Sequence, residues 1–138
     1  MVSMIVGNKG SGKTKRLIAL IHEAVVNSKG LVVCVEKVKK LTYDVDYRVR
    51  LMDTDSVGVT GFDAFYGFFA GICSCNYDVT DIFVDATLRI VGRDFEKLGQ
   101  FMERISKLSE ATNTNITFTI SCDEHELTPE TMEFARKI

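Results

Sequence analysis

The residues with the clearest chemical purpose form a glycine-rich segment near the start of the chain. An apolar run over residues 4–6 leads directly into Gly7, Asn8, Lys9, Gly10, Ser11, Gly12, Lys13 and Thr14. Glycines allow turns that a Cβ would forbid, so successive backbone N–H groups can point at one phosphate. Lys13 can then reach the outer phosphates of a nucleotide, and the Thr14 hydroxyl can ligate Mg²⁺. We therefore expect these eight residues to bind a phosphate.

Such a segment needs a strand before it and a helix after it. The apolar run supplies the strand. Residues 15–29 place six apolar side chains on one helical stripe, and Gly30 follows as a stop signal. A helix at this place would add the positive end of its dipole to the same anion.

A second landmark lies about seventy residues further along the chain. The segment 81–84 predicts an apolar strand, and Asp85 follows it. A carboxylate at the carboxyl end of such a strand can hold Mg²⁺ through water, opposite Thr14. Thr14 and Asp85 are therefore the predicted metal residues.

The G-x-x-x-x-G-K-[ST] spacing and the apolar strand ending in Asp85 resemble Walker A and Walker B of the P-loop NTPase superfamily, in its RecA-like or thymidine-kinase-like ATPase branch. The resemblance implies ATP and Mg²⁺ as ligands. In the RecA-like branch a glutamate commonly follows the Walker B aspartate and orients the attacking water, whereas this chain has Ala86 followed by Thr87. Fast hydrolysis is therefore not expected.

Several residues could replace the missing glutamate. Glu36 at the tip of a strand could act as a general base, and Asp123 or Glu124 could do the same or be solvated loop charges. Ser121, or Thr119 below it, is similar to the polar sensor residue that many ATPases carry on the strand beside Walker A. The predicted catalytic residues are Lys13, Glu36 and Ser121.

Two arginines, Arg89 and Arg93, follow Asp85 on a predicted loop. They could stabilise the charge of phosphoryl transfer or simply make a basic surface loop.

The whole chain, residues 1–138, predicts a single α/β domain: a three-layer, doubly wound, mostly parallel sheet of about five strands with helices on both faces. Buried strands are expected at residues 31–36 and 115–121. Strict alternation over residues 42–51 predicts a half-exposed edge strand, which could run antiparallel, and residues 57–59 predict another short strand. Ligands of such sheets bind outside the carboxyl ends of the strands.

The remaining helices have recognisable starts. Residues 60–63 are similar to a capping box, an amphipathic helix follows Asp94, and a short helix begins near Pro129. Phe65, Phe68 and Phe69 form an aromatic stripe, which indicates core packing or, alternatively, a platform for a nucleotide base.

Composition limits the classes of function. The net charge of −2 does not support nonspecific nucleic-acid binding, although a local basic patch is compatible with it. No apolar run reaches the length of a membrane span, so a cytoplasmic protein with reduced cysteines is expected. Cys73, Cys75, Cys122 and His125 could alternatively be the four ligands of a zinc site, in place of free side chains.

Three functions remain open from the sequence. The first is ATP binding with slow or partner-stimulated hydrolysis, and a protein partner or a homo-oligomer could complete the site. The second is a small nucleoside or nucleotide kinase. The third is a nucleotide-dependent interaction module that does not hydrolyse its ligand.

Overall fold

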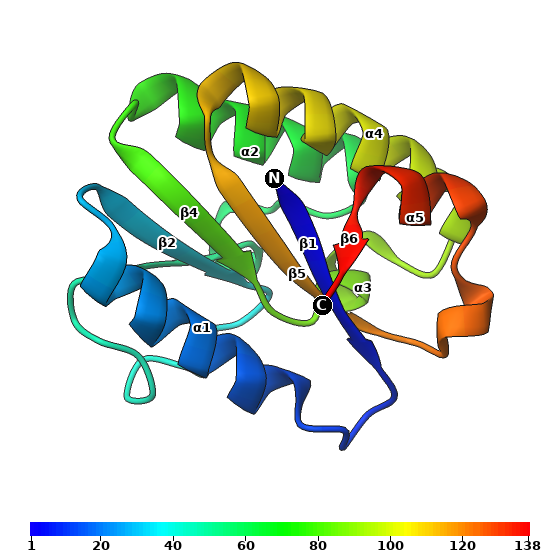
Figure 1. The fold of residues 1–138 in the computed structure, drawn as a ribbon, viewed down its shortest axis with the longest axis horizontal. Coiled ribbons are helices and arrows are strands. Elements are labelled where there is room, and N and C mark those ends of the chain that lie inside the picture. Colours follow the sequence, from blue (N-terminus) through cyan, green and yellow to red (C-terminus); the bar gives the residue numbers. More distant parts are fainter.

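The computed structural model describes residues 1–138 as one six-stranded sheet with helices on both faces (Figure 1). The strands are β1 (Val2–Gly7), β2 (Leu31–Glu36), β3 (Arg50–Asp53), β4 (Val79–Val84), β5 (Asn115–Ser121) and β6 (Arg136–Lys137). Their order is β3-β2-β4-β5-β1-β6, and every pairing is parallel. The predicted doubly wound parallel fold is confirmed. The sheet has six strands where about five were predicted, and neither edge strand runs antiparallel as the sequence allowed.

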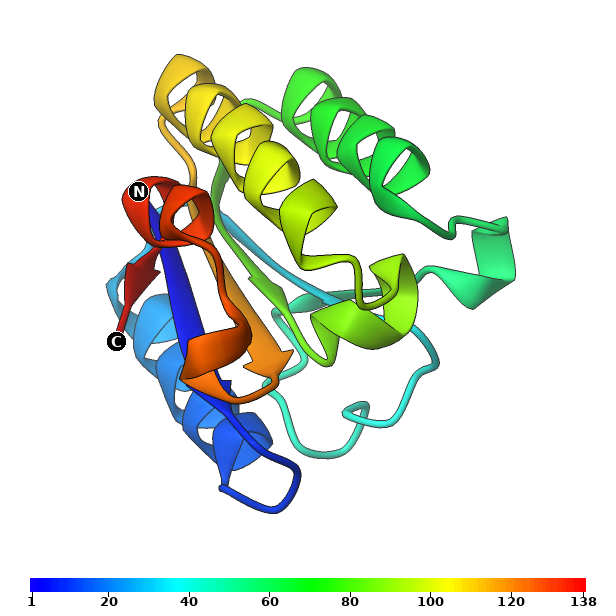
Figure 2. The ribbon, with the colours of Figure 1, turned by 90° about the vertical axis from the view of Figure 1, so that its right-hand side faces the viewer.

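The helices divide unequally between the two faces of the sheet. They are α1 (Lys13–Asn27), α2 (Phe62–Cys75), α3 (Thr87–Val91), α4 (Phe95–Thr112) and α5 (Pro129–Phe134), with 3₁₀ turns η1 (Asp55–Val57) and η2 (Glu124–Glu126). Helix α1 alone packs on one face, where Leu17 and Ile21 are fully buried, while α2, α4 and α5 lie on the other (Figures 1 and 2). This arrangement makes three layers.

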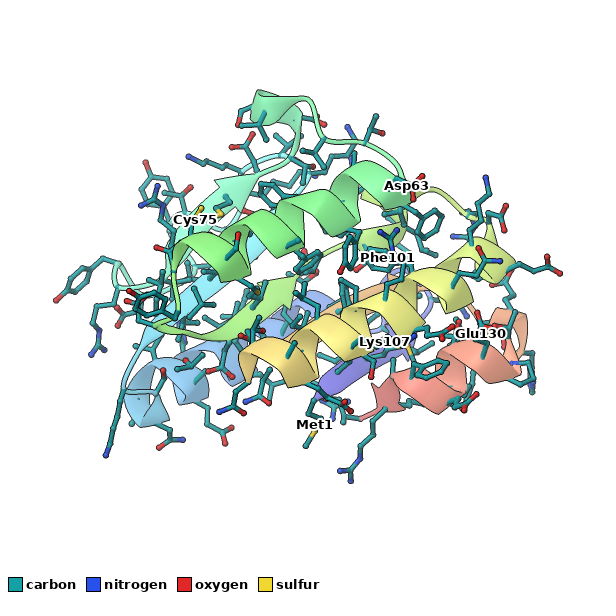
Figure 3. The ribbon with its side chains drawn as sticks, turned by 90° about the horizontal axis from the view of Figure 1, so that it is seen from above. Met1, Asp63, Cys75, Phe101, Lys107 and Glu130 are labelled. Atoms are coloured by element: carbon teal, nitrogen blue, oxygen red, sulfur yellow. The ribbon has the colours of Figure 1, made fainter.

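The larger core lies under α2 and α4, which run side by side (Figure 3). The Phe101 ring of α4 lies 5.8 Å from the Phe65 ring and 6.0 Å from the Phe118 ring, centroid to centroid. Phe65 and Phe69 are fully buried. Phe65 and Phe69 are therefore core packing and cannot serve as a platform for a nucleotide base, while the half-buried Phe68 packs against the same core.

The alternating segment 42–51 is mostly a loop, so the predicted edge strand is wrong. Residues 37–49 cross from β2 to β3 through successive turns, in which Val45 N–H donates to the Leu41 carbonyl and Val49 N–H to the Asp46 carbonyl. Leu41, Val45 and Val49, four residues apart, are buried against α1. The buried side chains of an alternating sequence can therefore anchor a loop made of turns, and the alternation alone does not show a strand. The true edge strand, β3, begins only at Arg50.

Two smaller predictions also fail. Residues 57–59 form no strand, because η1 ends at Val57 and Gly58 takes a left-handed φ of 68°. Helix α2 has no capping box, since Gly61 precedes it and the Thr60 hydroxyl donates instead to the Ile90 carbonyl at 3.4 Å.

The starts of α4 and α5 agree with the prediction. Asp94 caps α4 by accepting from Lys97 N–H, and Thr128 caps α5, in which Pro129 is the first residue. No helix of the chain has both the length and the apolar character that crossing a membrane requires.

Parallel pairing brings the functional candidates to one edge of the sheet. Strand β5 lies between β1 and β4, and β2 lies beyond β4. The carboxyl edge therefore carries, in order, the 7–14 loop after β1, Ser121 at the end of β5, Asp85 after β4 and Glu36 at the end of β2.

Candidate functional site

The 7–14 loop depends on glycine at three positions for different reasons. Gly10 and Gly12 have φ values of +86° and +84°, which side chains with a Cβ rarely adopt. Gly7 has an ordinary backbone, but a Cβ there would lie 2.5 Å from the Ser11 hydroxyl. Ser11 N–H closes the turn on the Asn8 carbonyl at 3.1 Å. The loop is thus a tight turn with its backbone open to the solvent side.

Helix α1 begins at Lys13 without any side-chain cap. The first N–H groups of a helix have no partner within it, so these donors remain available. No acidic residue lies in the first turn, whereas Lys13 and Lys15 do. The uncapped donors, the positive end of the helix dipole and these ammonium groups together favour an anion.

Lys13 is folded onto its own loop. Its Nζ donates to the Asn8 carbonyl at 3.0 Å and to the Ser11 hydroxyl at 3.4 Å, and the residue is only 9% exposed. The ammonium group is therefore already positioned beside the backbone that would surround a phosphate.

Thr14 and Asp85, 71 residues apart in the chain, meet directly. The Thr14 hydroxyl lies 3.2 Å from each carboxylate oxygen of Asp85. Thr119 of β5 supports the same carboxylate, because its hydroxyl donates to Asp85 Oδ1 at 2.9 Å and accepts from Ala86 N–H at 2.7 Å. Thr119 is 1% exposed, so its two hydrogen bonds are partly sheltered from solvent, whereas the contact between Thr14 and Asp85 is exposed.

Ala86 takes a left-handed conformation, with φ 53° and ψ 51°, that non-glycine residues seldom adopt. Helix α3 begins at the next residue, so Arg89 lies on a helix and not on the predicted loop. Strained backbone of this kind is common beside functional sites. Here the Ala86 N–H is turned toward Thr119.

Glu36 lies beside Asp85 in the sheet and on the same face. Cys34 and Phe83 are opposite one another in the pairing of β2 with β4, and each carboxylate lies two residues after its partner in this pair. Glu36 is 4% exposed, and its carboxylate accepts from Lys40 N–H at 3.2 Å and more weakly from Leu41 N–H. Burial raises the pKa of Glu36, these N–H groups lower it, and the negative charges of Asp85 and Asp53 raise it further.

The other predicted substitutes lie apart from this group. Asp123 caps η2 by accepting from His125 N–H, and Glu124 pairs with Lys137 at 2.7 Å. Neither lines the hollow at the 7–14 loop. Their contacts are those of structural loop residues.

A hollow of about 380 Å³ joins these parts. Its walls include Lys13 and Thr14 from the loop, Asp85 and Ala86 after β4, and Thr119 and Ser121 from β5. Lys9, one of the eight residues predicted to bind phosphate, also lines it, as does Lys15, for which the sequence predicted no role. The loop, metal and sensor candidates therefore share one hollow, whereas Glu36 lies beside it and does not line it.

A second hollow of about 130 Å³ has Ala86 and Ser121 in common with the first and adds Arg89 and Arg93. The Arg93 guanidinium donates to the Ser121 carbonyl at 2.9 Å and pairs with Glu126 at 3.5 Å. Arg93 is therefore held beside the carboxyl end of β5.

The cysteines are dispersed. Cys73 and Cys75 end α2, at the edge of the sheet where β4 begins, whereas Cys122 follows the carboxyl end of β5. No group of three or more histidine, cysteine, aspartate or glutamate side chains is arranged to hold a metal ion.

Comparison of the sequence with protein-family models gave no match, and neither did comparison with curated proteins.

Proposed function

We propose that this chain is a P-loop protein that binds Mg²⁺–ATP at the 7–14 loop and hydrolyses it slowly or on stimulation by a partner. The meeting of the Thr14 hydroxyl and the Asp85 carboxylate beside the uncapped start of α1 carries the proposal. Mg²⁺ prefers oxygen ligands, and the Thr14 hydroxyl and the Asp85 carboxylate place such oxygens 3.2 Å apart. The free N–H groups of α1 and the ammonium groups of Lys13 and Lys15 lie next to Thr14 and favour phosphate. One hollow would therefore suit both Mg²⁺ and the phosphates of ATP.

Each residue of the hollow has a distinct role in this proposal. Lys13 and the first N–H groups of α1 would hold the phosphates, while Thr14 and Asp85 would hold Mg²⁺. The ion would offset negative charge on the phosphates when bound. Thr119 keeps the Asp85 carboxylate turned toward Thr14. Ser121 lies at the tip of the neighbouring strand, where it can contact an outer phosphate.

Glu36 is the proposed general base. Its raised pKa makes it a better proton acceptor than an ordinary carboxylate, and Asp85 lies on the neighbouring strand. Its carboxylate now accepts from Lys40 N–H and Leu41 N–H, so it must leave these donors before it can take a proton from water. This requirement, together with alanine after Asp85, favours slow hydrolysis.

Nucleotide binding is tested by thermal and urea unfolding with millimolar ATP or ADP, each with and without Mg²⁺. A micromolar site would gain about 4 kcal/mol at this concentration. Lys13→Ala and Asp85→Asn should each abolish most of the gain. Lys29→Ala, which removes the same charge at the far end of α1, should not change it. A wild-type protein whose stability is the same with and without nucleotide would overturn the proposal.

Hydrolysis is tested by phosphate release. Glu36→Gln should reduce the rate and leave the nucleotide-dependent gain in stability intact, whereas Glu124→Gln should leave both unchanged. Equal rates in the wild type and Glu36→Gln would remove Glu36 from the mechanism. Absence of turnover in the wild type, with the gain in stability retained, would favour the non-hydrolysing module.

A kinase is the second candidate, and the hollow that contains Arg89 and Arg93 favours it. Two guanidinium groups beside the phosphate site could hold a phosphorylated acceptor. Transfer of labelled phosphate from ATP to a nucleoside or nucleotide, in place of release to water, would support the kinase over the ATPase.

A further inference from the structure

The crossover between β2 and β3 concentrates positive charge in an otherwise acidic chain. Residues 37–50, called here the 37–50 segment, contain five basic and two acidic residues, a net charge of +3. The whole chain has −2, so the other residues together have −5. The net charge of the chain thus conceals a local basic surface, which lies beside α1 at the β3 edge (Figure 1).

Part of this charge is neutralised and part is free. Lys37 pairs with Asp55 at 2.9 Å, and Arg48 pairs with Asp46 at 3.0 Å. The remaining cations, Lys39, Lys40 and Arg50, are exposed and have no carboxylate partner.

Two of the free cations also share a hollow. Lys39 and Arg50 line a depression of about 280 Å³ at the β3 edge. Two carboxylates without a cation partner stand against the three free cations: Asp44 in the segment, and Asp53, which lines the same depression and bonds to Ser56. The balance still leaves a net positive charge that attracts an anion.

Two tyrosine rings stand out from the same segment. Tyr43 is 100% exposed and Tyr47 is 93% exposed. Their neighbours Val45 and Val49 are buried against α1, and the turn bonds described above fix the backbone between them. The rings are therefore held outward on an anchored loop, on successive turns, with little of their surface in contact with the protein.

We propose that the 37–50 segment binds single-stranded nucleic acid, with phosphates on Lys39, Lys40 and Arg50 and unpaired bases stacked on Tyr43 and Tyr47. Exposed aromatic rings combined with free cations are the two components from which such surfaces are built. An acidic peptide would use the cations but would leave both rings without a flat partner. A duplex would hide its base faces from the rings. The proposal does not depend on nucleotide binding at the 7–14 loop.

The test is a titration of the whole protein with a labelled oligothymidylate of about twenty nucleotides at low salt, followed by anisotropy. Tyr43→Ala and Tyr47→Ala should each weaken binding at least about fivefold, from the usual strength of base stacking. Three phosphate contacts predict a slope of log K against log salt near −2, and Lys39→Gln should make it less steep by about 0.7.

Tyr77 provides the matched control. It is 99% exposed and lies in the turn between α2 and β4, outside the 37–50 segment, so Tyr77→Ala should bind like the wild type. The chain has four tyrosines and no tryptophan, so tyrosine fluorescence reports stacking directly. The oligonucleotide should quench it in the wild type, and less in the Tyr43 and Tyr47 variants.

Several results would overturn the proposal. These are no binding at low salt, equal weakening by Tyr77→Ala, and unchanged binding in the Tyr43 and Tyr47 variants. Equal or tighter binding of a duplex, of polyglutamate or of vesicles rich in phosphatidylserine would assign the surface to another partner. Because the altered rings are fully exposed, an unchanged circular dichroism spectrum is expected, and it ensures that lost binding reflects the lost ring.

Discussion

Thr119 connects the two halves of the candidate site, and its removal should destabilise the protein in a way that the structure quantifies. The substitution Thr119→Val replaces the hydroxyl by a methyl group of similar size, so it leaves no cavity. The Ala86 N–H loses its acceptor at 2.7 Å, and Asp85 loses a donor at 2.9 Å. An unsatisfied buried donor costs about 1–3 kcal/mol, and a hydrogen bond to a charged group contributes about 1.5–3 kcal/mol.

These contributions are reduced by the surroundings of Asp85. Its carboxylate is half-buried and keeps the Thr14 contact, so water and Thr14 replace part of the lost bond. We therefore expect Thr119→Val to lower the free energy of unfolding by about 2–4 kcal/mol. Thr119→Ser keeps the hydroxyl and should lose no more than about 1 kcal/mol.

The assay is urea unfolding followed by far-ultraviolet circular dichroism, with Thr117→Val as control. Thr117 lies on the same face of β5 and is 9% exposed, but it takes no part in the bridge to Asp85. Its valine variant should lie within about 0.5 kcal/mol of the wild type. If Thr119→Val and Thr117→Val unfold at the same urea concentration, the reasoning on the Thr119 bridge is refuted.

Three further predictions follow from buried groups. Since burial raises the pKa of Glu36, its contribution to stability is complete below the usual glutamate pKa and is lost as the pH rises through the raised value. Glu36→Gln should therefore gain stability relative to the wild type as the pH rises above the usual glutamate pKa, and parallel urea-derived profiles would contradict this. Cys75 is the exposed thiol, whereas burial raises the pKa of Cys122 to about 11 and raises that of Cys34 further. A maleimide should therefore label Cys75 first. Mass spectrometry of the labelled protein should show a fast phase that Cys75→Ser removes. Phe101→Ala should lower the free energy of unfolding by about 3–5 kcal/mol in urea, because the ring lies at the centre of the aromatic core; a loss below about 1 kcal/mol would show that the core can close around the gap.

The fold could be predicted where a local pattern matched a buried element. The apolar residues of 31–36 and 115–121 have few alternatives to buried strands, and both form strands. The segment 42–51 failed because alternation does not separate a strand from turns with an apolar residue at every fourth position. Strand β6 has no apolar pattern at all, and pairing with β1 alone defines it.

The candidate site divides in the same way. Gly7, Lys13 and Thr14 could be found from their spacing, and Asp85 from the strand before it. The contact between Ala86 and Thr119 could not be found, because it depends on a backbone turn after β4 and on which strand lies next to β4. Thr119 itself was predicted only as an alternative to Ser121 for the sensor residue, so its bond to Ala86 is new.

The place of β1 in the sheet also determines when the 7–14 loop can acquire its shape. Of the six strands of this sheet, β1 is synthesised first, but it pairs only with β5 and β6, which are synthesised last among them. At about 5–20 residues per second, more than a hundred residues must be added first, which takes roughly 6–23 s. Until then β1 has no strand to pair with, and Asp85 lacks the neighbouring Thr119. A ribosome-bound chain that ends before Asn115 should thus remain unable to retain nucleotide, however complete its glycine-rich loop.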